Sequence, residues 1–394
     1  MVKLWVQTIG IGSFTIIMVV GNGLFIPLIP EIQKNLQLNA SQASLVLGSF
    51  SYAGAIMIPL SSWLSRSYGR KKVLTISLLL LLIGCVLSST AGFTENLELA
   101  YYEILGGRIL QGVGAGAAAP MGLILASELY HGSDQIKMIS NLEIMNGVAK
   151  AISPVCGGLI MLYAWQTGFI WYMALASVSL AVVLFLLRPG NVGTEVVASN
   201  KEPINNWKWV SPLFALGFMV MFLLYGLLFI VAALISQSGQ RGIFVSLPLA
   251  MLVIISYFYG RSNQHSFRQI QRLIYFGIAM LLMSGCIACF HYLSINFTII
   301  ASMVVGAAAG ILLPASSNLL LMVTPEYCKK KAITWLTMFR FLGVATGPVV
   351  FGMWSNQWME HVFYLIGLVG VLGLVFVVCW QRSGHSHVTM MDTK

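Results

Sequence analysis

Several charged side chains fall inside long apolar segments of this chain, where an ionisable group is costly and usually has a function. Glu143, Gly147 and Lys150 follow one another at positions i, i+4 and i+7. On a helix this spacing places them on one face, so an acid and a base are directed toward the same space. Such an acid could couple transport to protons if a substrate competes with the proton for it. A purely structural ion pair is the alternative.

Two further basic residues lie within apolar segments. Arg108 lies well inside the segment 99–124, so its side chain must face a polar interior. We expect Arg340, in the segment 332–355, to lie too near the cytoplasmic side to touch a substrate. A structural or gating role is therefore favoured for Arg340, and snorkelling of its long side chain to the interface is the alternative.

Polar side chains in other segments could line a central cavity together with these charges. The candidates for a substrate-binding cavity are Asn22, Gln111, Asn146, Lys150 and Tyr225. The 20 methionines of the chain would suit an adaptable apolar surface around them. Packing against other helices or lipid is the alternative for each of these residues.

The elements that must position these residues are membrane-spanning helices. Hydrophobic residues make up 58% of the 394 residues and charged residues 9%, which is far more apolar surface than a soluble fold could bury. The first apolar segment is too long for the core of a signal peptide, so we expect it to be a retained span. The expected spans are 5–30, 43–64, 73–92, 99–124, 138–161, 168–188, 208–235, 243–260, 270–291, 296–322, 332–355 and 361–381.

The net charge of +10 reports topology rather than nucleic-acid binding. Nearly all basic residues outside the spans fall on alternate connections, and the remaining connections hold only Lys34 and Arg241. By the positive-inside rule both termini are cytoplasmic, which predicts a multi-pass protein of a plasma membrane of the bacterial inner-membrane type. Contact with anionic lipid is expected at the basic side.

An internal repeat divides the chain into two like halves. Residues 116–158 align without a gap on residues 310–352, and shared glycines, prolines and a lysine fall on the same positions. Such a duplication in so apolar a chain is typical of transporters. The predicted units are an N-terminal six-helix half, a cytoplasmic linker, a C-terminal six-helix half and a cytoplasmic tail at 1–188, 189–207, 208–381 and 382–394.

Arg108, Gln111 and Gly112 form an Arg-x-x-Gln-Gly sequence in the fourth expected span. In this motif the chain resembles the major facilitator superfamily, and in particular its twelve-span drug:proton antiporters. The resemblance implies an all-α membrane protein with twelve transmembrane helices in two pseudo-symmetric six-helix halves, which rock about a midplane cavity.

The resemblance also implies a proton-coupling pair. Glu31 follows Pro27 and Pro30 at the end of the first span, where similar antiporters place a titratable acid near the arginine of the fourth span. We therefore expect Glu31 to lie near Arg108, with an ordinary interfacial charge as the alternative. Glu103 is the reserve acid.

The fifth span of exporters in this family carries small residues that lead to Gly-Pro and then a pair of glycines. In this chain three of those glycines are replaced by other small residues, and the eleventh span is closer to the pattern. Pro154 is followed by Gly157 and Gly158, and the equivalent positions in the eleventh span include Gly347 and Pro348. Small residues beside a proline allow a tight, bent helix contact on which the halves can rock. Ordinary helix packing is the alternative.

The connection between the second and third spans departs from the family pattern. Its Gly-Arg-Lys end is kept at Gly69, Arg70 and Lys71. Arg66, however, stands where the family has an acid that belongs to a charge network locking the cytoplasmic side. Glu128 or Asp134 could replace that acid in this chain.

The expected function is the export of a small amphiphilic compound, such as a drug, antibiotic or metabolite, in exchange for protons. The embedded bases match or outnumber the acids, which favours a zwitterionic or anionic substrate. No phosphate loop, cofactor site or metal site is expected, and no cluster of residues suggests an enzyme. A monomer is expected, with substrate, protons and lipids as its partners. An importer or facilitator of sugars or metabolites, and a lipid flippase, are the alternatives on the same fold.

Overall fold

The computed structural model describes residues 2–130, 132–186, 207–261, 266–288, 290 and 294–355, which form helices joined by short connections. No strand occurs among these residues. The first part of the chain forms α1 (Val2–Gly23), η1 (Ile26–Leu28), α2 (Ile29–Asn35), α3 (Ala40–Tyr68), α4 (Arg70–Thr90), η2 (Ala91–Phe93), α5 (Leu97–Leu129), α6 (Gly132–Ile160) and α7 (Thr167–Leu186). The second part forms α8 (Trp207–Leu234), α9 (Ser238–Arg261), α10 (Phe267–Ala288), α11 (Ile295–Val323) and α12 (Glu326–Ser355).

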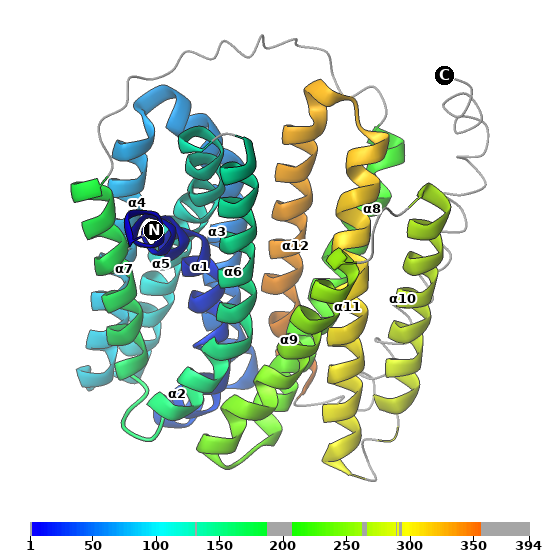
Figure 1. Cartoon of the computed structure of the whole chain (residues 1–394). Coiled ribbons are helices and arrows are strands. Elements are labelled where there is room, and N and C mark those ends of the chain that lie inside the picture. The colour runs from blue at the N-terminus through cyan, green and yellow to red at the C-terminus, as the bar shows by residue number, and fades with distance from the viewer. Residues whose placement is uncertain are drawn as a thin grey trace.

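The helices run up and down, so that successive connections alternate between two ends of the molecule (Figure 1). We call one of them the basic end, because it holds the junction of α3 and α4 with Arg66 and Arg70, the start of α6 with Lys137 and the start of α12 with Lys329. The opposite end, which holds η1, α2 and the start of α9, is the far end. The basic residues that the sequence places on alternate connections are thus gathered at one end of the molecule.

The lengths of the helices fit a membrane. Ten of those that the structure describes are long and apolar enough to span one, and α1 and α8 are the most buried of them. The helix α6 is as long, with 29 residues, but it is not among those ten, because polar and charged residues interrupt its apolar sequence. The protein is therefore a multi-pass membrane protein in which α6 is the least lipid-like long helix.

The structure adds detail to the first expected span and shifts one predicted boundary. One span does occur there, over Gly10–Asn35, but it is not a uniform helix: α1 ends at Gly23, a short 3-10 helix with Pro27 in its first turn follows, and α2 continues to Asn35. Proline lacks the N–H that would continue the helical ladder. Trp207, placed in the linker, is the first residue of α8. The rest of the linker, the twelfth expected span at 361–381 and the tail lie outside the described residues.

The two parts of the chain lie side by side as two halves, and they pack through two helix pairs (Figure 1). The first pair is α3 with α12, and the second is α6 with α9. The repeat places α6 and α12 at equivalent positions of the two halves, so each half contributes the same kind of helix to the interface. This is the arrangement that a duplicated transporter requires.

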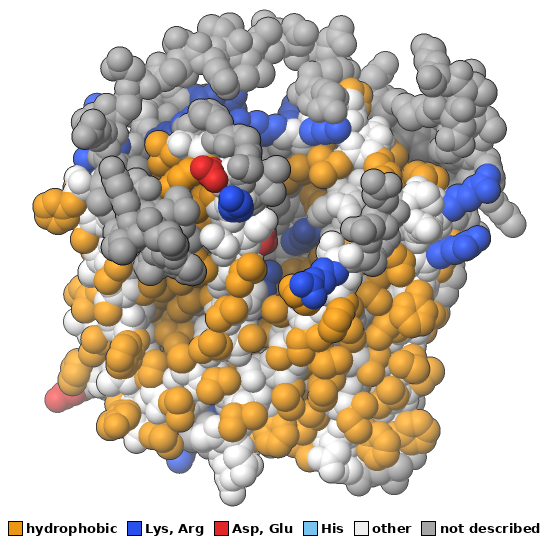
Figure 2. All heavy atoms as spheres, viewed as in Figure 1, with side chains coloured by type: hydrophobic (Ala, Val, Ile, Leu, Met, Phe, Trp, Pro, Cys, Tyr) orange, Lys and Arg blue, Asp and Glu red, His pale blue; other side chains and the backbone are white. Residues whose placement is uncertain are grey.

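The halves touch from the far end to about the middle of the helices. Tyr52 of α3 donates a hydrogen bond to Thr346 of α12 with a length of 3.1 Å, and Gly242 of α9 lies against Gly158 of α6. Toward the basic end α6 and α12 are drawn apart in Figure 1. Figure 2 shows this face hollowed between the halves in its upper part, where basic and acidic side chains gather, above an almost wholly hydrophobic lower part. The conformation is closed at the far end and open toward the basic end.

Candidate functional site between the two halves

The helix α6 presents different residues to lipid, to its neighbours and to the interior. Ile144, Val148 and Ile152 are about half exposed and form the outward stripe. On another side Gly147 approaches Val253 of α9 so closely that an added methyl group would lie 3.2 Å from it. The helix period then directs Glu143, Asn146 and Lys150 between the contacts with α1 and α9, into the interior. Glu143 and Lys150 are close enough for their charges to interact, whereas Gly147 between them packs against α9. That this acid and base serve transport stays a prediction.

The polar stripe of α6 lies within electrostatic range of Arg340 of α12 in the other half, although α6 and α12 do not pack closely against each other. Lys150 lies close enough to both Glu143 and Arg340 for their charges to interact with it. Lys150 is partly exposed, and its ammonium has no hydrogen-bond or ion-pair partner among the described residues. The interior between the halves therefore contains two positive charges and one negative charge.

The guanidinium of Arg340 is bonded through Nη2, whereas its Nε has no hydrogen bond with a described residue. Its Nη2 donates to the carbonyl of Leu313 at 2.6 Å and to the hydroxyls of Ser316 and Ser317 at 3.0 Å each, all on α11. Its Nε is buried and has no partner among the described residues. Arg340 is near the middle of α12, which begins at Glu326, before the predicted start of the span at 332, and is described as far as Ser355. That Arg340 lies too near the cytoplasmic side to touch a substrate stays a prediction.

Two other members of the stripe also lack partners in the described structure. The Oδ1 of Asn146 is buried without a hydrogen bond, and Glu143 is exposed without an ion pair. Buried polar atoms without partners are unusual in folded proteins, and each needs an explanation. The described ion pair of α6 is Asp134 with Lys137, 3.7 Å apart in its first turns. It lies at the basic end, away from the stripe.

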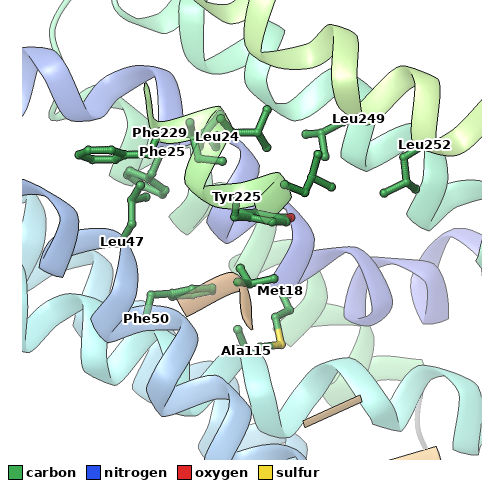
Figure 3. Close-up of a cluster of buried hydrophobic side chains, with 14 of the residues drawn as sticks. Met18, Leu24, Phe25, Leu47, Phe50, Ala115, Tyr225, Phe229, Leu249 and Leu252 are labelled. Atoms are coloured by element: carbon green, nitrogen blue, oxygen red, sulfur yellow. The ribbon is translucent and has the colours of Figure 1, made fainter. Parts of the chain in front are cut away.

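An apolar region lies between the halves beside this stripe. Figure 3 shows Tyr225 of α8 between Leu24 and Phe229 on one side and Met18 on the other, with Leu249 and Leu252 of α9 nearby. Tyr225, expected in the cavity, is 7% exposed, and its hydroxyl has no hydrogen bond with a described residue. The side chains of both halves thus form a buried apolar cluster that includes a hydroxyl.

Arg108 is fully buried, but its partners are not acids. It donates to the carbonyls of Gly21 at 2.8 Å and Val46 at 3.2 Å and to Oε1 of Gln111 at 2.8 Å. Its guanidinium carbon lies 4.5 Å from the centroid of the Phe25 ring and 4.2 Å from that of the Phe50 ring. Arg108 therefore ties α1, α3 and α5 together inside the first half.

This network corrects two of the residues expected in the cavity. The Nε2 of Gln111 donates to the carbonyl of Gly84 and the hydroxyl of Ser88 on α4, so Gln111 is turned away from the interface. The Oδ1 of Asn22 accepts a hydrogen bond of 2.7 Å from Ser51, which joins α1 to α3, and Asn22 is 2% exposed. Both side chains are occupied by contacts within the first half.

Glu31 does not meet Arg108, and the expected pair is absent from this conformation of the described chain. Glu31 instead accepts a hydrogen bond from Asn35 and lies within electrostatic range of Arg241, at the start of α9. Arg241 is 5% exposed and donates to the carbonyls of Ile235, Ser236 and Pro27. The reserve acid, Glu103, accepts a hydrogen bond from Thr94 near the far end of α5.

Arg241 is a residue that motif-based reasoning missed. The carbonyl of Pro27 belongs to the first half, so the guanidinium of Arg241 connects the two halves at the far end. One signal in the sequence pointed to it. Arg241 and Lys34 are the only basic residues on a side of the chain that is otherwise free of them.

The glycines and prolines predicted to serve gating or packing lie at close helix contacts. A methyl group at Gly112 would collide with the Phe50 carbonyl of α3, at Gly157 with the Leu24 carbonyl beside α1, and at Gly347 with the Phe222 carbonyl of α8. Pro154 and Pro348 are interior to α6 and α12. These positions carry the close packing expected of them, and a gating role is not decided by packing.

The Gly-Arg-Lys sequence at the junction of α3 and α4, which matches the family pattern, makes local contacts. Gly69 has a φ of 84°, a conformation that glycine adopts without strain. The Nζ of Lys71 donates to the carbonyl of Leu184 near the end of α7, at 3.0 Å. The Nε of Arg66 donates to the carbonyl of Ser62 within its own helix. Asp134 pairs with Lys137 rather than with Arg66, and the side chain of Glu128 lies outside the described residues.

Comparison with known proteins agrees with this architecture. Residues 11–295 match the family model of the Major Facilitator Superfamily. The bacillibactin exporter of Bacillus subtilis is 28% identical over 385 residues, which cover 94% of this chain and 95% of the exporter. A D-xylose-proton symporter superposes with a TM-score of 0.73 at 17% identity, covering 95% of this chain and 96% of the symporter. A nucleoside transporter superposes with a TM-score of 0.70 at 13% identity, covering 95% and 99% of the two chains. The chain belongs to the Major Facilitator Superfamily.

Proposed function

We propose that the protein is a secondary exporter that moves a small amphiphilic compound out of the cell in exchange for protons. The observation that carries the proposal is the polar stripe of α6, which faces Arg340 in an interior open toward the basic end. By the positive-inside rule the basic end faces the cytoplasm, so a compound could enter the interior from there. The bacillibactin exporter, similar over nearly its whole length, is a precedent for export by a chain of this plan.

Glu143 is the acid that we propose carries the proton. It is exposed in the interior, and Lys150 is the charged group that faces it from its own helix, with Arg340 beyond Lys150 on α12. Exchange requires that substrate and proton compete for one group. An ionised Glu143 would bind a positive or hydrogen-bond-donating group of the substrate, and protonation from the far side would release it.

Alternating access supplies the remaining step. The halves would rock about the contacts of α3 with α12 and α6 with α9, closing the basic end and opening the far end. The protein would work in the plasma membrane as a monomer surrounded by lipid.

Transport into inside-out membrane vesicles tests the proposal. Substrates are first found by expressing the chain in a host without its own exporters and screening a panel of antibiotics together with bacillibactin for resistance. We expect uptake of a compound so identified when the vesicle interior is acidic, and loss of uptake when the gradient is collapsed. Glu143→Gln should abolish gradient-driven accumulation, because the amide does not bind a proton, while exchange of labelled for unlabelled compound continues.

Glu103→Gln is the matched control, because Glu103 is an acid of the neighbouring helix that is already bonded to Thr94. Its transport should equal that of the unchanged protein. Uptake that ignores the gradient would contradict proton exchange. Uptake confined to right-side-out vesicles would identify an importer, and gradient-independent movement of fluorescent phospholipid would identify a lipid flippase.

A further inference from the structure

The positive charges of Lys150 and Arg340 lack an adequate counter-charge within the protein. They come from opposite halves, and their interaction with each other is repulsive. Glu143 can neutralise only one of them. An unbalanced charge at this depth costs several kcal/mol unless water or a ligand compensates it. The side chains of the protein alone therefore leave this region with a net positive charge.

The hydrogen-bonding capacity of this region is also incomplete. Arg340 is fixed by three bonds through Nη2 to α11, so its guanidinium is oriented before any ligand arrives, and its Nε remains a buried donor without a partner. Lys150 has all the donors of its ammonium available among the described residues. The Nε of Arg340 lies beside Gly217 of α8, so the accessible donor is the ammonium of the partly exposed Lys150, next to the fixed positive charge of Arg340. A charged donor without an acceptor in the described protein is suited to an acceptor brought by a ligand.

Asn146 adds an acceptor on the same face. Its buried Oδ1 has no partner, and it lies one helical turn from Lys150. In the internal repeat Asn146 occupies the position equivalent to Arg340, so the two side chains sit at matching depths of the two halves. A ligand with an acidic group and a neighbouring hydroxyl or amine would match this set: its acidic group would bind the positive side chains, and its hydroxyl or amine would donate to Asn146.

The buried apolar cluster around Tyr225 indicates the chemistry of the rest of the ligand. The stretch of α9 that contains Leu249 and Leu252 also supplies Val253, which packs against Gly147 between Asn146 and Lys150. Hydrophobic side chains therefore lie next to the charged groups. A compound that contacts the charged groups and these hydrophobic side chains at the same time needs an apolar body attached to its acidic group.

We propose that Lys150 and Arg340 together bind the acidic group of the transported compound, which is an organic acid or zwitterion with an apolar body. This inference rests on the proposed transport function and names the chemistry of its substrate. Because one basic residue comes from each half, the acidic group would join the halves as it binds. A positive group on the same compound would take the place of the proton at Glu143.

Binding to the purified full-length protein in nanodiscs tests the inference with acid–ester pairs. The probes are rhodamine B with its ethyl ester and N-benzoyltyrosine with its ethyl ester, measured by fluorescence titration or ligand-induced thermal stabilisation. Each ester keeps the apolar body and removes the negative charge. We expect at least one acid to bind about tenfold more tightly than its ester, which corresponds to about 1.4 kcal/mol.

Lys150→Gln should remove this preference for the acid while affinity for the ester stays within about twofold, since Lys150 makes no described bond that the fold needs. Arg340→Gln should have the same effect, and Arg340→Lys should retain part of the preference because it keeps the charge. Lys137→Gln is the matched control, because it removes an exposed positive charge from the same helix. A selectivity ratio separates the binding role from a general loss of folded protein, which would weaken acid and ester alike.

Equal binding of acid and ester, failure of both acids to bind the unchanged protein, or a preference for the acid that survives Lys150→Gln would overturn the inference. The measurement needs no proton gradient, so its outcome is separate from that of the vesicle experiment. Acid preference without gradient-driven transport would remove the exporter proposal alone. Transport by a protein that ignores the acidic group would remove the binding inference alone.

Discussion

Three arginines of this molecule have different roles, and their hydrogen-bond partners distinguish these roles. Arg108, Arg241 and Arg340 are all arginines within helices, but Arg108 is satisfied by two carbonyls, an amide and two aromatic rings of its own half. Arg340 has a buried donor without a partner among the described residues, and Arg241 reaches across to the other half. Burial alone would have ranked Arg108 first as a transport residue. Its complete set of partners argues for a structural role.

Arg108→Ala is therefore expected to destabilise the protein by about 3 kcal/mol, because charge-assisted hydrogen bonds, ring contacts and buried volume are lost together. Thermal unfolding in detergent measures the effect. Arg108→Lys should recover little of it, since an ammonium cannot span the same three acceptors. Arg66→Ala, at an exposed site, is the control and should unfold like the unchanged protein. Normal stability of Arg108→Ala together with lost proton coupling would instead support the coupling role expected from the sequence.

At the scale of the element, the glycine-rich sequence of α5 works as a packing surface with two sides. Gly112 and Gly116 face backbone atoms of α3, while Gly107 and Gly114 face those of α4. The alternation follows from the helix period, and it explains why the GxGxG pattern occurs in a membrane helix without a phosphate to bind. In α6, Ser153 lies against Gly23 of α1, and its hydroxyl is buried without a partner among the described residues. The equivalent position of the second half is Gly347 of α12, which lies against the Phe222 carbonyl of α8, so the two halves repeat this helix contact with different residues.

Gly112→Ala should cost about 2 kcal/mol, because the new methyl group meets a backbone carbonyl that cannot move aside. Gly106→Ala in the same helix is the matched control, since its methyl group would meet only Leu87 at an ordinary 3.7 Å. That substitution should be neutral or slightly stabilising, as alanine favours the helix. The thermal midpoints of the two variants in detergent check the difference, and equal midpoints would refute the packing argument.

For the whole molecule, the contacts between the halves decide which end is open. The pairs α3 with α12 and α6 with α9 touch at the far end, and Arg241 adds hydrogen bonds there with Glu31 nearby. The repeat predicted two like halves, and the structure shows that their differences lie at the interface. Asn146 and Arg340 are equivalent positions with different chemistry, as are Lys150 and the buried Val344.

Arg241→Ala should shift the molecule toward opening at the far end, because a bond between the halves is lost. A loss of about 1–2 kcal/mol changes the ratio of closed to open molecules roughly 5- to 30-fold. Cysteines placed at Tyr52 and Thr346, with the native cysteines replaced, report closure through the yield of cross-linking between them. Lys34→Ala is the control, because Lys34 is the other basic residue of the far end and is exposed. An unchanged yield in Arg241→Ala would show that this arginine does not hold the far end closed.

Composition, hydropathy and the repeat were sufficient to predict an all-helical membrane protein of two like halves. Each of these features can be read from the residues of single helices, without knowledge of how the helices pack. The face shared by Glu143 and Lys150 was predictable for the same reason, since helix periodicity is a local rule. Partners were not predictable in that way. Whether Glu31 meets Arg108 or Arg241, and whether Gln111 faces a cavity or α4, depends on the rotation and depth of helices packed from distant parts of the chain. The sequence by itself thus determined that the chain forms apolar, membrane-length helices and which residues share a face of each, whereas only the tertiary structure decided which faces lie opposite one another, and so placed Lys150 of one half within electrostatic range of Arg340 of the other.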